Sequence, residues 1–230
     1  AFFAHVAAEA GKPVMEVYAS DFSPDQKADK SPVTEADKRA EEVIVERLVR
    51  EMPHVPIIAE ERWSDGVRPE GGRRFILVDP VDGTKEFIKK NGEFTVNIAL
   101  VEDGVPVAGA VYAPALGRMF FGAEAGGAAE APTRAGAAFV PGEARAIRAR
   151  PADTRRLVAV MSRSHADERT LAFAVAEGVT ETVSAGSSLK FCLLAEGVAD
   201  LYPRFAPTME WDTAAGHAVL AGAGGRVATP

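Results

Sequence analysis

The most informative stretch of the sequence is Val78-Asp79-Pro80-Val81-Asp82-Gly83-Thr84-Lys85-Glu86-Phe87. It begins at the last residue of the apolar run 75–78 and leads into a predicted helix. A short apolar run rich in β-branched and aromatic residues indicates a buried strand. Asp79 and Asp82 stand three residues apart at the polar end of this strand, and the proline between them fixes the backbone. Both carboxylates can therefore converge on one point, with the Val81 carbonyl turned between them.

This donor set suits a hard cation, because Mg²⁺ prefers oxygen ligands and retains several waters. Backbone N–H groups of Gly83 and Thr84 at a helix start form a cradle for a phosphate group. In an alternative interpretation, Asp82 caps the helix and Asp79 begins a loop. The stretch alone favours neither interpretation.

Two further acidic sites shift the balance toward a cation. Glu60-Glu61 ends the predicted strand 55–58, and Asp212 in Trp211-Asp212-Thr213-Ala214-Ala215-Gly216 begins another predicted helix. Their structural alternatives are a solvated loop pair and a helix N-cap. Carboxylates gathered within about 5 Å would cost about 3 kcal/mol per pair at an effective dielectric constant near 20. Such a cluster implies raised pKa values or bound metal, and the adjoining phosphate cradle favours metal.

The rest of the chain predicts a mixed α/β protein in two halves. The first half is α+β and sheet-rich, with a helix at 34–52 and strands at 55–58, 75–78, 94–101, 105–112 and 119–121. The second half alternates strands at 157–161, 179–184 and 199–202 with helices at 167–177, 188–196 and 213–221. Residues 126–150 are dense in Ala, Gly, Pro and Arg, so we expect a loop-like seam there. We place the halves at 1–135, with the metal and phosphate site, and 136–230, and expect one merged domain.

Composition excludes several classes of protein. The 230 residues are 47% hydrophobic and 26% charged, which is typical of a globular chain with a substantial core. The formal net charge of −7 argues against a nucleic-acid polymer as partner. No apolar run is long enough to span a bilayer, and the single cysteine, Cys192, excludes an internal disulfide. We expect a soluble, cytoplasmic protein. A first residue other than Met and a strand-like end at 227–230 predict that both ends are trimmed.

Three motifs resemble those of the inositol monophosphatase superfamily of Mg²⁺-dependent, lithium-sensitive phosphatases. They are Glu60-Glu61, Asp79-Pro80-Val81-Asp82-Gly83-Thr84 and Trp211-Asp212-Thr213-Ala214-Ala215-Gly216. Further stretches resemble the CysQ-type 3'(2'),5'-bisphosphate nucleotidases within that superfamily: 84–88, 91–99, 162–165, 186–192 and 201–204. The resemblance covers nearly the whole chain. It implies the layered αβαβα sandwich of the inositol monophosphatase and fructose-1,6-bisphosphatase-like superfamily.

The resemblance assigns a role to each residue of the acidic motifs. It implies two or three Mg²⁺ ions on Glu60, Asp79, Asp82, Asp212 and the Val81 carbonyl. The catalytic residues that it implies are Glu60, Thr84 and Asp37, with Thr84 and Asp37 orienting and deprotonating the attacking water. Gly83 and Thr84 would hold the phosphate that is cleaved, and Asp212 would also contact substrate. The stretch 34–37 is equally a helix capping box, and the two roles of Asp37 are not exclusive.

Substrate selectivity is expected from the second half. The resemblance implies that His165, Ser187, Lys190 and Arg204 hold the adenosine and the phosphate that is not cleaved. Without it, Lys190 and Arg204 would be interpreted as solvated surface charges and His165 as a loop residue. A bisphosphate adds about four negative charges to an acidic protein, so local cations would be needed for capture. We expect Trp211 and Cys192 to be packing residues.

The implied activity is hydrolysis of the 3'-phosphate of adenosine 3',5'-bisphosphate to give AMP, with 3'-phosphoadenylyl sulfate as a further substrate. It also implies inhibition by Li⁺ and a scavenging role in sulfur assimilation. An inositol-phosphate or sugar-phosphate phosphatase is the first alternative, and a catalytically silent metal-binding regulatory protein is the second. The resemblance is compatible with a monomer or a homodimer and with peripheral contact at the cytoplasmic face of the inner membrane.

Overall fold

A computed structural model describes residues 1–26, 32–70, 72–163 and 167–229. Its centre is a seven-stranded sheet in which sequence order equals spatial order. The strands are β3 (Ile57–Ala59), β4 (Arg74–Asp82), β5 (Thr95–Glu102), β6 (Val105–Ala113), β7 (Arg118–Ala123), β8 (Gly127–Pro132) and β9 (Arg145–Ile147). The pair β3–β4 is parallel and every later pair is antiparallel. The polar end of β4 therefore lies beside the end of β3.

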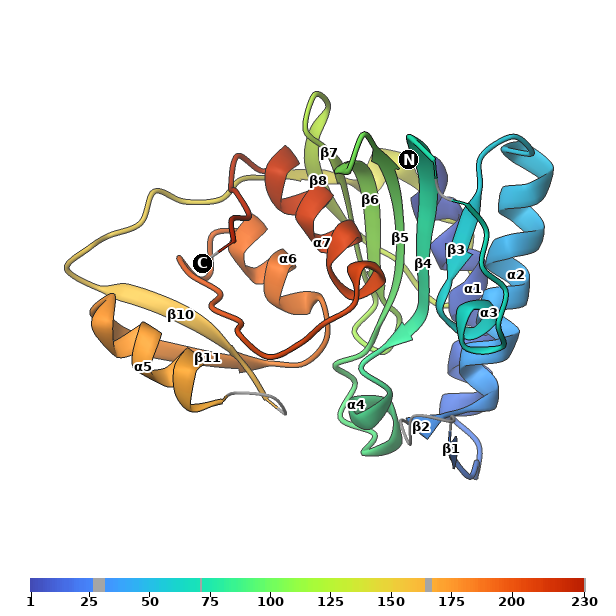
Figure 1. The fold of residues 1–230 in the computed structure, drawn as a ribbon, viewed down its shortest axis with the longest axis horizontal. Helices are drawn as coiled ribbons and strands as arrows, with labels where there is room; N and C mark the ends of the chain where they lie inside the picture. The colour runs from blue at the N-terminus through green and yellow to red at the C-terminus, as the bar shows by residue number, and fades with distance from the viewer. Residues whose placement is uncertain (27–31, 71, 164–166, 230) are drawn as a thin grey trace.

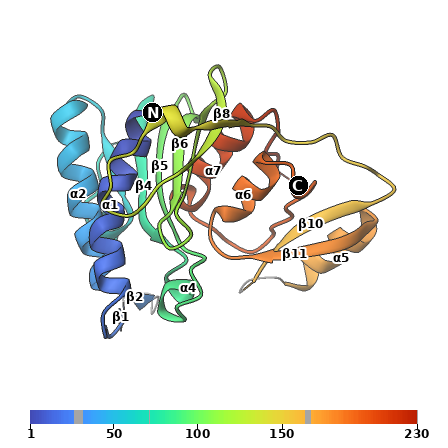
Figure 2. The same cartoon turned by 180° about the vertical axis from the view of Figure 1, so that it is seen from behind.

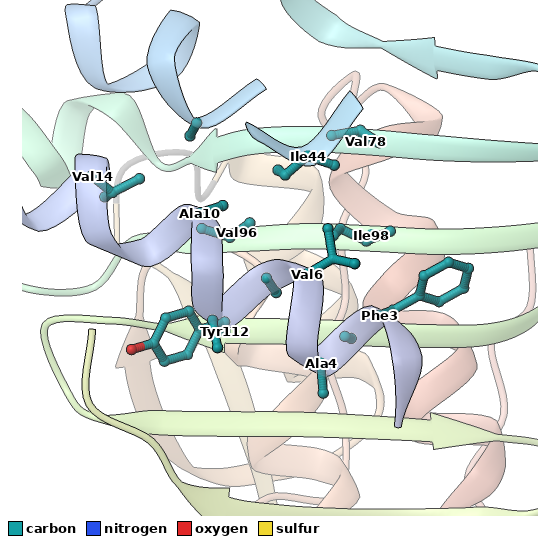
Figure 3. Packing of buried hydrophobic residues seen from close by; sticks show 14 of the residues in the cluster. Phe3, Ala4, Val6, Ala10, Val14, Ile44, Val78, Val96, Ile98 and Tyr112 are labelled. Carbon is teal, nitrogen blue, oxygen red and sulfur yellow. The ribbon is translucent and has the colours of Figure 1, made fainter. Parts of the chain in front are cut away.

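Two long helices, α1 (Phe2–Tyr18) and α2 (Glu35–Glu51), cover one face of this sheet (Figure 1). α2 begins at a capping box on Thr34, and its buried positions repeat every three or four residues. Figure 3 shows Val6 of α1 next to Ile98 and Ala10 next to Val96, on the sheet. Each aliphatic side chain buried in this layer contributes roughly 1.5–3 kcal/mol relative to an exposed one.

The opposite face of the sheet carries α6 (Leu189–Ala195) and α7 (Glu210–Gly222) (Figure 2). α7 packs closely because β6 has a glycine beneath it. A Cβ atom on Gly109 would lie 2.6 Å from the Ala215 carbonyl oxygen, so a larger residue would push the helix away. Trp211 and Cys192 are both buried in this layer, as predicted.

A small second sheet lies beyond α6 and α7. Its strands β10 (Leu157–Ser162) and β11 (Val179–Ala185) are parallel and are connected through α5 (Glu168–Ala176), the outermost helix in Figure 1. The order of layers is thus two helices, large sheet, two helices, small sheet, one helix. This is the predicted αβαβα arrangement.

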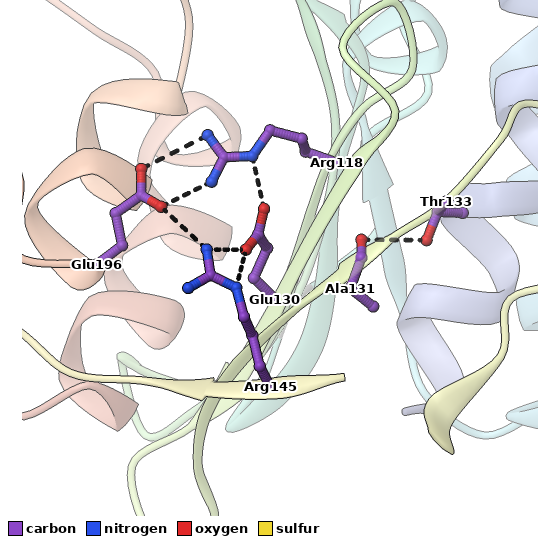
Figure 4. Close-up of polar contacts among 6 residues, drawn as sticks. All are labelled: Arg118, Glu130, Ala131, Thr133, Arg145 and Glu196. Atoms are coloured by element: carbon purple, nitrogen blue, oxygen red, sulfur yellow. Dashed lines mark hydrogen bonds and ion pairs between the residues drawn. The ribbon is translucent and has the colours of Figure 1, made fainter. Parts of the chain in front are cut away.

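An ionic network ties the large sheet to α6 (Figure 4). Arg118 of β7 donates to Glu130 of β8 at 2.6 Å and to Glu196, at the end of α6, at 2.6 Å. Arg145 of β9 donates through Nε to Glu130 at 2.7 Å. Each carboxylate is only 10% exposed, whereas the Arg118 and Arg145 side chains are 29% and 66% exposed, so the network joins the two layers at a place that water reaches in part.

Several predicted elements need correction. Residues 126–150 are not loop throughout, because β8 and β9 lie within them as part of the large sheet; outside these two strands and η1 the segment is irregular. Strand 199–202 is reduced to one parallel bridge between Leu201 and Ala159, and 225–229 form no strand. The prediction also omitted α1 and the short elements β1 (Asp25–Gln26), β2 (Pro32–Val33), α3 (Glu60–Ser64) and η1 (Pro141–Glu143), whereas α4 (Thr84–Ile88) is the helix predicted to start at Gly83 and Thr84. None of the helices in the described ranges combines the length and apolar character needed to cross a bilayer.

Candidate active site

The parallel pair β3–β4 brings the first two acidic motifs together. Ala59 is paired with Val78, so the residues that follow them, Glu60 and Asp79, emerge side by side at the same sheet edge. Glu60 begins α3 there, and its carboxyl group is among the neighbours that raise the pKa of Asp79.

The sequence motif 79–82 lies within β4, which continues past the predicted strand end at Val78. Asp79 is paired with Asn97 and Asp82 with Thr95, so β4 has one residue more than β5 between these pairs. This bulge lets both aspartates approach one place although they are three apart. Asp79 Oδ1 accepts from Val81 N at 3.0 Å, and the Val81 carbonyl accepts from Thr84 Oγ1 at 3.3 Å.

The third carboxylate comes from α7. This helix begins at Glu210, three residues before the predicted start, so Asp212 is its third residue and not its N-cap. Asp212 Oδ2 accepts from Thr208 Oγ1 at 2.7 Å and from Met209 N at 3.1 Å. Carboxylate oxygens of Asp79, Asp82 and Asp212 lie within 4.8 Å of one another.

The cluster is electrostatically costly in its ionised form. Burial, followed by the charges of Glu60 and Asp82, holds the pKa of Asp79 well above its usual range. Burial and the charge of Asp212 raise the pKa of Asp82 to about 7, although Lys190 opposes the rise. Like charges this close persist in ionised form only with a compensating cation.

The donors fit a hard divalent cation. The cluster lies in a cavity whose lining includes the carboxylates of Glu60, Asp79, Asp82 and Asp212, a further acidic residue, Glu86, and the backbone at Val81. No histidine or cysteine is among the described lining residues. An all-oxygen set of this kind suits Mg²⁺, Ca²⁺ or Mn²⁺ better than zinc or copper.

A buried polar network connects Asp82 to the second half of the chain. Asp82 Oδ2 accepts from Ser188 N at 2.5 Å and from Asn97 Nδ2 at 3.4 Å. Ser188 Oγ donates to Asn97 Oδ1 at 2.7 Å and lies 2.8 Å from Thr95 Oγ1. One oxygen of Asp82 is thus engaged by protein. The sequence analysis did not identify Ser188, Asn97 or Thr95 as site residues. The one sign of them in the sequence is that Thr95 and Asn97 are polar residues within the otherwise apolar strand β5.

Gly83 forms the turn between β4 and α4. Its φ of 88° is in the left-handed region, and a Cβ atom there would meet the Glu93 carbonyl oxygen and Ser187 Cβ, each at 3.2 Å. Glycine is therefore required both by conformation and by the close approach of the second half. Ser187 itself has a φ of 48°, an uncommon value for a residue with a side chain.

Two cations, Lys190 and Arg204, line the same cavity as the carboxylates. Lys190 is only 3% exposed, and its ammonium group donates to the Ser187 carbonyl and lies 5.3 Å from the Tyr202 ring centre. Burial lowers the pKa of Lys190, while Asp82 opposes that shift. Arg204 donates to the Pro207 carbonyl at 3.0 Å and to the Tyr202 hydroxyl at 3.3 Å. Lys190 is therefore a buried cation and not a solvated surface charge.

The cavity has a volume of about 390 Å³, within the range of small-ligand sites. Its lining includes most predicted site residues: Glu60, Asp79, Val81, Asp82, Gly83, Thr84, Ser187, Lys190, Arg204 and Asp212. Asp37 is not among them. It is 1% exposed and completes the capping box of α2, accepting from Thr34 N at 2.8 Å and from Thr34 Oγ1 at 2.7 Å. His165 lies outside the described residues.

Comparisons with known proteins agree with this geometry. The 3'(2'),5'-bisphosphate nucleotidase CysQ of Salmonella typhimurium is 47% identical over 226 residues, covering 96% of this chain and 87% of that protein. The CysQ of Buchnera aphidicola is 40% identical over 234 residues, covering 97% of this chain and 82% of that protein.

Two solved structures extend the likeness to three dimensions. CysQ from Bacteroides thetaiotaomicron, a bacterial member of the inositol monophosphatase family, matches with a TM-score of 0.80 and 40% identity over 96% of this chain and 84% of that chain. The IMPase of Thermotoga maritima matches with a TM-score of 0.75 and 26% identity over 97% of this chain and 82% of that chain. The inositol monophosphatase family model matches residues 1–230. With its carboxylate cluster at the end of β4 and its five layers, this chain belongs to the inositol monophosphatase family.

Proposed function

We propose that the protein is a Mg²⁺-dependent phosphomonoester hydrolase that removes the 3'-phosphate of adenosine 3',5'-bisphosphate to give AMP, and that it also acts on 3'-phosphoadenylyl sulfate. The observation that carries this proposal is that one cavity holds an acidic cluster and two buried or half-buried cations, Lys190 and Arg204. The names of relatives at 40–47% identity support the choice of substrate.

The metal part of the proposal rests on the oxygen donors. Glu60, Asp79, Asp82, Asp212 and the Val81 carbonyl would hold two or three Mg²⁺ ions. When bound, Mg²⁺ would supply Lewis-acid polarisation of the phosphate and an acidified water. Because Ser188 N engages Asp82 Oδ2, the other oxygen of Asp82 is the one available to a cation.

The remaining residues bind and orient the reacting groups. Gly83 and Thr84 would hold the phosphate through their backbone amides, and the Thr84 hydroxyl would orient the attacking water. For Asp37, the capping role has geometric support, and its second role of helping Thr84 to accept the proton of this water stays a prediction. Asp212 would contact substrate as well as metal.

Selectivity for a nucleotide with two phosphates would come from residues of the second half. Ser187, Lys190 and Arg204 line the same cavity, and the two cations would pair with the phosphate that is not cleaved. A substrate without that second phosphate gains nothing from these cations. We keep His165 as a predicted contact to the adenosine.

The decisive experiment measures inorganic phosphate released from adenosine 3',5'-bisphosphate and from inositol 1-phosphate, with Mg²⁺, with Mg²⁺ plus Li⁺, and with chelator. We expect Mg²⁺-dependent release that favours the nucleotide and decreases with Li⁺. A preference of about ten-fold or more for inositol 1-phosphate, about 1.4 kcal/mol, would replace the substrate with the alternative phosphatase. No release from either substrate would favour a silent regulatory protein.

A further inference from the structure

Helix α2 presents a second buried carboxylate, Glu41, one turn after Asp37. Glu41 is 3% exposed, although its neighbour Glu42 on the same helix is exposed to solvent. It does not line the cavity, and neither the family motifs nor the proposed chemistry use it. A buried carboxylate is costly unless its oxygens are satisfied, so the question is what Glu41 binds.

Glu41 binds the backbone of the segment that follows Glu60. Its Oε2 accepts from Glu61 N at 2.7 Å, and its Oε1 accepts from Arg62 N at 3.0 Å. The Arg62 guanidinium adds a contact of 3.8 Å to Oε1. Each oxygen therefore takes one amide of α3, a helix whose preceding residue, Ala59, provides no side-chain cap.

With these bonds, the backbone is held in place both before and after Glu60. Before Glu60, the pairing of Ala59 with Val78 locks the chain to β4. After Glu60, the two amides bonded to Glu41 lock the first turn of α3. The direction in which the Glu60 carboxylate leaves the backbone is thus set by strand pairing and by Glu41 together. A change at Glu41 would let the segment rotate and carry the Glu60 oxygens away from Asp79.

We propose that Glu41 is a positioning residue for the metal centre, which acts through the backbone at Glu61 and Arg62 to hold Glu60 in ligating geometry. This inference rests on the proposed function insofar as Glu60 is taken as a metal ligand. It needs no assumption about which phosphate ester is the substrate.

The test compares three variants of the full chain with the wild type. Glu41→Gln keeps the shape of the side chain, but its NH₂ group would face one of the two backbone N–H groups and could not accept from it. Glu41→Asp keeps the carboxylate, but the side chain is one methylene shorter and no longer reaches both N–H groups. Glu42→Gln is the matched control, because it removes the same charge from an exposed position one residue away. Far-ultraviolet circular dichroism and thermal unfolding establish that each variant is folded at the temperature of measurement.

The main readout is the affinity for Mn²⁺, used as an oxygen-seeking probe and followed by electron paramagnetic resonance of the free ion without substrate. We expect the Mn²⁺ dissociation constant to rise about 10- to 100-fold in Glu41→Gln and Glu41→Asp, the usual effect of losing a partner that orients a ligand. Glu42→Gln should bind Mn²⁺ like the wild type. In phosphate release, the Glu41 variants should need more Mg²⁺ for half-maximal rate and recover most of kcat at saturating Mg²⁺.

Wild-type Mn²⁺ affinity in either folded Glu41 variant would overturn the inference and leave Glu41 a purely structural residue. So would a lack of Mn²⁺ binding by the wild-type chain, because there would be no centre to position. A wild-type chain that binds Mn²⁺ but cleaves neither phosphate ester would contradict the proposed function alone. The metal affinities would still decide the role of Glu41.

Discussion

Asp82 is the residue at which the electrostatics of the site converge. Its Oδ2 is held by Ser188 N, the charge of Asp212 repels it, and Lys190 attracts it. Burial is the largest cause of its raised pKa, so a neutral residue at this position would relieve a cost in the absence of metal. The same carboxylate is indispensable if a cation is to bind. Replacing Asp82 with a neutral residue should therefore lower the activity with metal, while the stability without metal is kept or increased.

We predict this opposition for Asp82→Asn. Phosphate release should fall at least about 100-fold at all Mg²⁺ concentrations, because a ligand is lost and not merely a partner that orients one. The unfolding temperature in chelator should stay equal or increase. The pair of measurements is phosphate release and thermal unfolding by circular dichroism. Substantial activity in Asp82→Asn would remove Asp82 from the metal centre.

A second prediction concerns the buried cation. Lys190→Met preserves the length and packing of the side chain but removes the charge that we assign to the phosphate that is not cleaved. We expect KM for adenosine 3',5'-bisphosphate to rise about 10- to 100-fold, the value of one charge-assisted hydrogen bond. KM for inositol 1-phosphate should change less.

The matched control for Lys190→Met is Lys89→Met, at an exposed position after α4 that is not among the cavity-lining residues. It should leave both KM values unchanged. An equal rise for both substrates in Lys190→Met would mean that Lys190 supports the carboxylates and does not select the nucleotide.

Sequence reasoning located the residues that carry local patterns. The sequence predicts Asp79 and Asp82 after an apolar strand and Asp212 at a helix start, and the resemblance implies that all three bind metal. Residues whose role depends on contacts between distant parts of the chain had no such local pattern. Glu41 is one of several glutamates in α2, and only its packing against α3 distinguishes it. The burial of Lys190 could not be predicted either, because it depends on the distance between α6 and Tyr202.

At the scale of elements, the hydrophobic pattern predicted the helices and strands whose apolar residues follow one simple spacing. α2 has one apolar face and β4 contains the apolar run 75–78, so the helix and the core of the strand were found. α1 was missed although its exposed residues Glu9, Lys12 and Glu16 recur at helical spacing, because it contains Gly11 and Pro13, which suppress the helical signal. β8 and β9 were missed because small residues have low strand propensity. The small side chains of β8 suit its packing against α7, because Ala128 is buried in the same cluster as residues of that helix.

The ionic network between the sheet and α6 gives a prediction at this scale. Glu130→Gln leaves the partly buried Arg118 and the exposed Arg145 without their shared, buried carboxylate. We expect the free energy of unfolding to fall by about 1–3 kcal/mol, as for loss of one partner of a buried charged hydrogen bond. Urea unfolding monitored by circular dichroism measures it.

The control for Glu130→Gln is Asp103→Asn, which breaks the bidentate pair with Arg73 at 2.6 Å and 2.9 Å on the protein surface. Surface pairs of this kind contribute little, so no measurable loss is expected. Equal effects from both variants would mean that the Arg118 network does not join the layers.

At the scale of the whole molecule, the cavity takes its groups from both predicted halves. Glu60, Asp79 and Asp82 come from residues 1–135, and Lys190, Arg204 and Asp212 come from residues 136–230. Ser188 N and Asp82 join the halves directly at the proposed metal centre. Metal binding should therefore stabilise both halves at once. That the two halves form one merged domain stays a prediction.

The last prediction links pH, metal and the stability of the whole fold. In the metal-free protein, the pKa of Asp82 is raised to about 7 from an ordinary value of 3.8, chiefly by burial. Its stabilising contribution is therefore fully present below pH 3.8 and is lost as pH rises through about 7. In chelator, we expect the wild type to lose stability relative to Asp82→Asn between pH 5.5 and pH 8, roughly the interval in which such a group ionises.

Mg²⁺ should reverse this trend, because the ligands must be deprotonated to bind it. At a concentration of about 100 times its dissociation constant, a bound cation adds roughly 2.7 kcal/mol to the free energy of unfolding. Protons compete for the same carboxylates at pH 5.5, so the rise in unfolding temperature on adding Mg²⁺ should be larger at about pH 8 than at pH 5.5. Thermal unfolding at the two pH values, with Mg²⁺ and with chelator, measures it. An equal rise at both would show that Mg²⁺ binds without displacing protons from the carboxylate cluster, and would place the metal elsewhere.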